Sequence, residues 1–117
     1  MDERIESLYE KAHADQAAFT PPVDPPDEEQ ALAFLTDGAG QAVWVYIDGR
    51  TGEWTRFSEG EYERLEWSMN QWLELYSACY GTSIEAEYPL RVAAELLLET
   101  HNIRDVAQLL THVPARP

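Results

Sequence analysis

Apolar residues recur at alternating spacings of three and four between residues 59 and 80, which indicates a helix with one buried face. Ser58 and Glu61 have the spacing of a capping box at the start of this stretch, and Gly81 follows its end. The pattern lasts for less than about three heptads, which is too short for a free coiled coil. The sequence therefore predicts a long core helix with these inward positions: Tyr62, Leu65, Met69, Trp72, Tyr76 and Cys79.

Two shorter helices are predicted near the C-terminus, at about 89–100 and 103–111. Pro89 suits the first position of the first helix, and Asn102 can cap the second. Both stretches carry Leu, Ala and Val at helical spacing, so each has an apolar face. We expect the two helices to pack together as an αα-hairpin.

A β-hairpin is predicted at about 42–57. Val43, Val45 and Ile47 alternate with Trp44 and Tyr46, which is the period of a strand. The stretch "DGRTG" that follows supplies turn residues, and residues 53–57 would return as the second strand. The change from period two to period 3.6 at Ser58 then predicts an α+β fold in which this hairpin packs on the long helix and the C-terminal helix pair.

The N-terminal third is predicted to contain two helices separated by prolines. Residues 2–18 have a modest apolar stripe, whereas "FTPPVDPPDEE" contains four prolines that cannot continue a helix. Asp27 can cap a short helix at 28–36 that "DGAG" stops, although "ALAFLT" also suits a first strand. We therefore expect an N-terminal helix at 1–18, a proline-rich linker at 19–27 and one α+β domain at 28–117.

The charge balance changes the picture of the surface. Twenty-two acidic residues against eight basic ones give a net charge of -14, and Lys11 is the only lysine. The acids are spread through every segment, which favours adaptation to a salt-rich cytoplasm over an acidic face that imitates nucleic acid. In this composition the chain resembles the small acidic, lysine-poor proteins of halophilic archaea. The same charge disfavours nucleic-acid binding, because phosphate backbones are repelled.

The stretch "LRVAAELLLETHNIRDVAQLLTH" resembles the closing helices of the tyrosine recombinase family. The resemblance would make Arg91 the second catalytic arginine and His112 the late histidine that contacts the scissile phosphate. Tyr88 stands where the family has a further histidine, and no tyrosine follows His112. Without that nucleophile the covalent step has no attacking group, so we expect no recombinase catalysis. The stretch "IRDVAQLLTHV" also resembles the first helix of a helix-turn-helix domain, but too few residues follow for a recognition helix.

Other residues give little indication of chemistry. His13, His101 and His112 do not have the spacing of a helical metal site, and the single cysteine, Cys79, falls on the apolar face of the long helix. We therefore expect no catalytic residue, no metal site and no cofactor. The chain also contains no apolar run long enough to span a bilayer, so we expect a cytoplasmic protein that does not bind membranes.

The sequence favours a non-enzymatic protein that binds a protein partner or a second copy of itself. Trp67 projects almost opposite the apolar face of the long helix, so it is either covered by the N-terminal segment or part of a binding surface. Trp44 and Tyr46 are further candidates for partner contacts. The competing hypothesis is a nucleic-acid-associated protein that uses Arg91 and Arg104 of the C-terminal helix pair.

Overall fold

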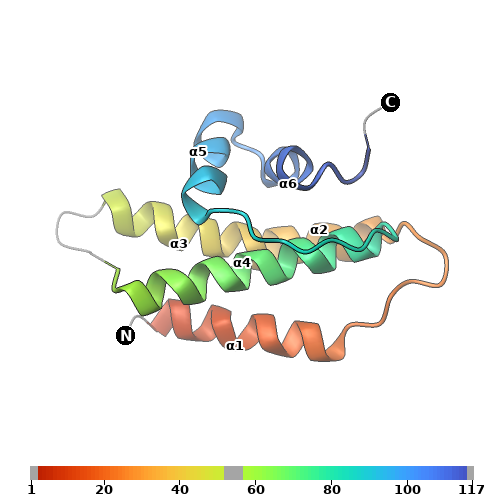
Figure 1. The fold of residues 1–117 in the computed structure, drawn as a ribbon, viewed down its shortest axis with the longest axis horizontal. Coiled ribbons are helices and arrows are strands. Elements are labelled where there is room, and N and C mark those ends of the chain that lie inside the picture. Colours follow the sequence, from red (N-terminus) through yellow and green to blue (C-terminus); the bar gives the residue numbers. More distant parts are fainter. Residues whose placement is uncertain (1–2, 52–56, 116–117) are drawn as a thin grey trace.

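Helix α4, Glu59–Cys79, is the element around which the others pack (Figure 1). The computed structural model describes residues 3–51 and 57–115. The predicted capping box is confirmed, because Ser58 Oγ accepts a hydrogen bond from the Glu61 N–H and the Glu61 carboxylate accepts one from the Ser58 N–H. The predicted apolar face of this helix is turned inward, and Trp72 and Cys79 are completely buried.

The predicted α+β class and the β-hairpin at 42–57 are wrong. Within residues 3–51 and 57–115 every regular element is helical. Helix α2 (Glu28–Phe34), a π-helical turn η1 (Leu35–Ala39) and helix α3 (Gly40–Thr51) follow one another without a break. The first predicted strand is therefore part of α3, and of the predicted second strand only Phe57 lies within the described residues.

Buried positions explain why residues 28–51 are helical. They recur every four residues along two adjacent rows, and the residues are Ala31, Leu35, Ala39, Val43 and Ile47 in one row and Phe34, Gly38, Ala42 and Tyr46 in the other. A step of four residues overshoots one α-helical turn by about 40°, so the rows would drift around a regular helix. The π turn contains more residues per turn and reduces this drift. Both rows therefore stay on the core side, and tertiary packing overrides the strand propensity of Val and Ile.

Contrary to the prediction from the sequence, the stretch "DGAG" does not end the helix at 28–36. Its glycines allow close packing instead. A Cβ atom added to Gly38 would lie 2.5 Å from the Trp72 ring, so only glycine lets the π turn approach that ring so closely. The ring also reaches α1, because Trp72 Nε1 donates a hydrogen bond to the Asp15 carboxylate at 2.9 Å. Trp72 thus joins three elements that are far apart in the sequence.

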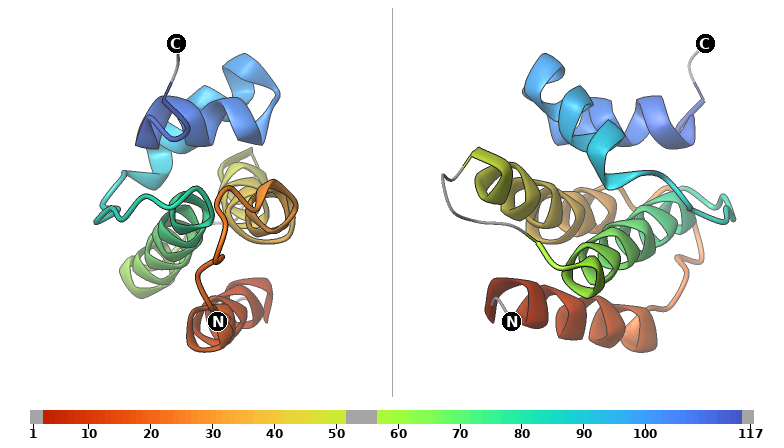
Figure 2. Two further views of the ribbon diagram at one scale, coloured as in Figure 1. Left: turned by 90° about the vertical axis from the view of Figure 1, so that its right-hand side faces the viewer. Right: turned by 60° about the vertical axis from the view of Figure 1, so that its left-hand side comes forward.

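The helices form three rods with a helix pair across them (Figures 1 and 2). The rods are α1 (Glu3–Ala18), the α2–η1–α3 run and α4. The α2–η1–α3 run is antiparallel to α1 and to α4. The pair consists of α5 (Leu90–Thr100) and α6 (Ile103–Thr111), whose predicted bounds are close to those observed. Helix α1 packs along α4 and places Ile5 and Ala12 in the same core as the rest of the chain.

The close approach at Gly38 generates a stability prediction. Gly38→Ala should lower the free energy of unfolding by about 1–3 kcal/mol, because the new methyl group overlaps the buried Trp72 ring. Gly60→Ala is the matched control, since its Cβ would meet only the Arg64 side chain at 3.5 Å and alanine favours helix. Urea denaturation followed by circular dichroism measures both. An unchanged midpoint for Gly38→Ala would show that the π turn is not held against the ring.

Candidate functional site

Trp67 is the centre of an aromatic cluster between α4 and α1. Its ring lies 4.3 Å from the His13 ring and 5.2 Å from the Tyr9 ring, measured between centroids. The Arg64 guanidinium lies over the Tyr9 ring at 5.8 Å. Helix α1 therefore covers part of Trp67, as expected if the N-terminal segment lies over this residue. The rest of the indole stays accessible.

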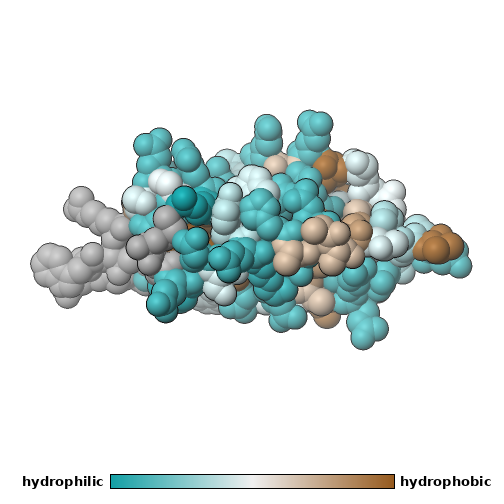
Figure 3. Space-filling view, turned by 90° about the horizontal axis from the view of Figure 1, so that it is seen from below, coloured by the Kyte–Doolittle hydropathy of each residue, from teal (hydrophilic) through white to brown (hydrophobic). Residues whose placement is uncertain are grey.

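A hollow of about 360 Å³ opens beside this cluster. It is lined by Tyr9, Gly60, Glu63, Arg64 and Trp67, which we call the α1–α4 surface. Tryptophan, tyrosine and arginine are the residue types that dominate binding energy in protein interfaces. Seen from below, the face that contains α1 is mostly hydrophilic, with small separate apolar patches (Figure 3). The α1–α4 surface thus combines rigid aromatic rings with charge of both signs.

Trp44 and Tyr46 lie on α3 and differ sharply in exposure. Trp44 is 52% exposed, and within the described part of the chain its ring stacks on no other aromatic ring. Tyr46 is only 7% exposed, because its ring packs against Phe57 and Tyr62. Trp44 therefore offers contact area to a partner, whereas Tyr46 offers almost none.

Arg91 and Arg104 occupy different environments in the C-terminal helix pair. Arg91 is exposed on α5 and forms an ion pair with Glu95 one turn later, with 3.5 Å between Nε and the carboxylate. Arg104 lies in the first turn of α6 and lines a polar hollow of about 300 Å³. Glu28 and Asp105 line the same hollow, so the field around Arg104 is not uniformly positive. The predicted contact residues are thus each accompanied by acids.

Three side chains of α4 hold an extended segment of the chain, and sequence reasoning missed this arrangement. The Ala86 N–H donates to Glu74 at 3.1 Å, the Tyr88 N–H to Asn70 at 2.9 Å and the Leu90 N–H to Glu66 at 2.9 Å. Asn70 Nδ2 also donates to the Tyr88 carbonyl oxygen at 3.1 Å. We call these contacts the α4 clamp. The segment runs alongside α4 in Figure 1.

The α4 clamp works because two spacings agree. Side chains four residues apart on a helix are separated by about 6 Å along its axis. Backbone groups two residues apart in an extended chain are separated by about 6.6 Å. Glu74, Asn70 and Glu66 therefore bind one N–H each, and together they bind every second N–H of the segment. In the sequence, the only sign of the α4 clamp is a polar residue at every fourth position of α4. A helix face exposed to solvent has the same pattern.

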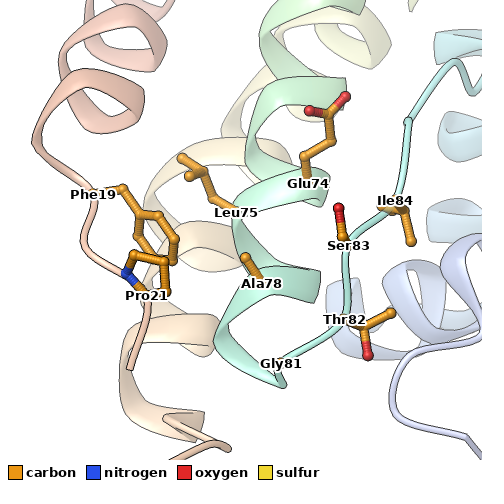
Figure 4. Close-up of a pocket in the computed structure, with 9 residues that line it drawn as sticks. All are labelled: Phe19, Pro21, Glu74, Leu75, Ala78, Gly81, Thr82, Ser83 and Ile84. Carbon is orange, nitrogen blue, oxygen red and sulfur yellow. The ribbon is translucent and has the colours of Figure 1, made fainter. Parts of the chain in front are cut away.

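A second hollow lies where the proline-rich linker passes the C-terminal end of α4 (Figure 4). Its volume is about 390 Å³, and Phe19, Leu75, Ala78 and Ile84 give it a largely apolar wall. The Glu74 carboxylate at its margin already accepts the Ala86 N–H. The hollow suits an apolar side chain better than it suits chemistry on a polar substrate.

The buried groups that could act as nucleophiles are kept neutral. Burial raises the pKa of the Cys79 thiol to about 11, with a smaller contribution from Asp27, so the thiol is protonated at neutral pH. Burial also raises the pKa of Tyr76, whose hydroxyl donates to the Val113 carbonyl oxygen at 2.6 Å.

Among the described residues no group of three or more His, Cys, Asp or Glu side chains could hold a metal ion. No helix in the described ranges is long and apolar enough to cross a membrane.

The chain belongs to a protein family described as Domain of unknown function (DUF8055), whose model matches residues 1–115. The match includes α1, the proline-rich linker and the C-terminal helix pair, so the family corresponds to the whole described architecture. No curated protein and no solved structure matches the chain.

The α4 clamp generates a prediction about the extended segment. Asn70→Ala should lower the free energy of unfolding by about 1–3 kcal/mol, because the partly buried N–H and C=O of Tyr88 lose their partner. The amide hydrogen of Tyr88 should also exchange faster with solvent. Gln71→Ala, at the next position of α4, is the control and should change stability by less than about 0.5 kcal/mol. Equal effects of the two substitutions would argue against the clamp.

Proposed function

We propose that this protein is not an enzyme and acts by binding another protein through the α1–α4 surface. The observation that carries the proposal is the accessible hollow beside Trp67, in which tryptophan, tyrosine and arginine side chains meet. Stacking on α1 already restricts the indole, so a partner would lose little entropy in fixing it. Trp44, half-exposed on α3, is a second candidate contact.

Electrostatics support a protein partner over nucleic acid. The net charge of -14 repels phosphate, and Arg91 already forms an ion pair with Glu95.

The environments of the cysteine and the three histidines support a non-enzymatic role. Cys79 is neutral and buried, His13 is packed in the aromatic cluster, and His101 and His112 close α5 and α6 as left-handed C-caps. Cys79 and His13 thus serve packing, and the backbones of His101 and His112 end their helices.

We further propose that the acidic surface is an adaptation to a salt-rich cytoplasm. Two of the eight basic residues, Arg4 and Arg91, form ion pairs with Asp48 and Glu95 that are exposed on both sides, and such pairs contribute little. Most acids therefore act on one another by repulsion at low ionic strength. Salt at molar concentration reduces the range of that repulsion to about 3 Å.

Partner capture tests the α1–α4 surface. Affinity purification from the native organism, in its own salt, should recover a protein partner with the wild-type chain and lose it with Glu63→Arg. This substitution reverses a charge at the hollow without removing a packed ring. Trp44→Ala, tested separately, determines whether the half-exposed indole contributes, and Gln16→Ala on exposed α1 surface is the control.

Several outcomes would contradict the proposal. Equal recovery of the partner by Glu63→Arg and by the wild-type chain would exclude the α1–α4 surface. Recovery of nucleic acid that disappears with Arg91→Ala and Arg104→Ala would favour the competing hypothesis. Recovery of the chain itself alone, with a dimer mass in light scattering, would make a second copy the partner.

Thermal melts test the adaptation to salt. The melting temperature should rise between about 0.1 M and about 3 M potassium chloride, because added ions screen the repulsion among the acids. Sulfate should raise it further by strengthening apolar burial. A nucleic-acid mimic from an ordinary cytoplasm must instead be fully folded at about 0.15 M salt. A melting temperature that stays constant or falls with added salt would contradict the adaptation.

A further inference from the structure

The extended segment held by the α4 clamp has a second edge. In an extended chain the N–H and C=O of alternate residues point to opposite edges. Those of Ala86 and Tyr88 point to α4, so those of Glu85 and Glu87 point away from it. Within the described part of the chain, the backbone groups of Glu85 and Glu87 form no hydrogen bond. We call these four groups the outer edge.

The outer edge has the properties of an exposed edge strand. Its backbone is fixed by the α4 clamp, so little further ordering is needed when another chain pairs with it. Glu85 and Glu87 are both exposed, whereas Ala86 between them is buried. Pro89, which has no N–H to donate, closes this edge at the next alternate position. Unpaired strand edges of this kind bind extended peptides by strand addition.

Charge selects the occupant of the outer edge. If two copies paired antiparallel about Ala86, Glu85 of each copy would face Glu87 of the other, and like charges directly opposite are destabilising. The net charge of -14 adds to that repulsion. A strand with arginine or lysine at alternate positions would instead face Glu85 and Glu87 with opposite charge.

We infer that the outer edge of residues 85–87 binds an extended segment of a basic partner protein by β-strand addition. The inference rests on the proposed function and names the chemistry of the partner. The acceptors are the carbonyl oxygens of Glu85 and Glu87, the donors are their N–H groups, and the carboxylates select for positive side chains. The Ser83 end of the segment borders the apolar hollow described above.

A synthetic peptide tests this inference. The probe has about seven residues, alternating valine and arginine, and its binding to the full chain is measured by fluorescence anisotropy at a salt concentration where the chain is folded. We expect binding, and at least about tenfold weaker binding when the peptide is N-methylated on the edge that pairs. Methylation on the opposite edge is the matched control and should change the affinity little. A peptide of alternating valine and glutamate should not bind.

Substitutions at one position separate backbone pairing from charge. Glu87→Pro removes an outward N–H that makes no bond within the protein, so it should weaken peptide binding at least about tenfold while circular dichroism stays unchanged. Glu87→Gln removes only the charge and should weaken binding about two- to fivefold. If Glu87→Pro unfolds the chain, the methylated peptides on the wild-type protein decide the question.

The outcomes distinguish this inference from the proposed function. Equal binding of both methylated peptides would overturn strand addition, and binding of the acidic peptide would overturn the selection for a basic partner. Absence of peptide binding together with capture of a partner that depends on Glu63 would reject the strand edge and leave the proposed function standing. Failure of both experiments would reject both.

Discussion

The packing of Trp72 is the constraint on which the rest of the structure depends. Its indole is completely buried, so its N–H needs an acceptor inside the protein, and Asp15 of α1 provides one at 2.9 Å. Asp15 in turn accepts a hydrogen bond from Lys11, which offsets the cost of placing a carboxylate in a partly buried site. On another side the ring meets Gly38, where a side chain would not fit. One residue therefore fixes the spacing between α1, η1 and α4.

Once these three elements are fixed, the rest of α4 has little freedom. The apolar face with Trp72 points inward, and Trp67 then lies under Tyr9 and His13 of α1. The row of Glu66, Asn70 and Glu74 lies on a further side, where it holds the extended segment. A single helix thus positions both candidate binding surfaces. A change in the packing of Trp72 would move them together.

The sequence predicts the elements whose signals are local, and it fails where the signal depends on packing. Helix α4 and its capping box are readable because large apolar residues and caps mark them. The run from α2 to α3 is not, because Gly38, Ala39 and Ala42 are buried without being strongly hydrophobic, while Val43, Val45 and Ile47 imitate a strand. The α4 clamp is hidden for another reason. Its residues bind a segment that lies far along the chain, and nothing in their spacing distinguishes them from a solvated face.

The structure also divides the acidic residues into two groups with different physical roles. Glu66 and Glu74 accept backbone N–H groups, Asp15 accepts the Trp72 indole N–H, and Asp27 caps α2. These contacts are 2.9–3.1 Å long and partly buried, so salt screens them far less than it screens charges at the surface. Exposed acids such as Glu85 and Glu87 instead act through the surrounding solution. Added salt can therefore relieve the surface repulsion while the carboxylates that hold the fold keep their partners.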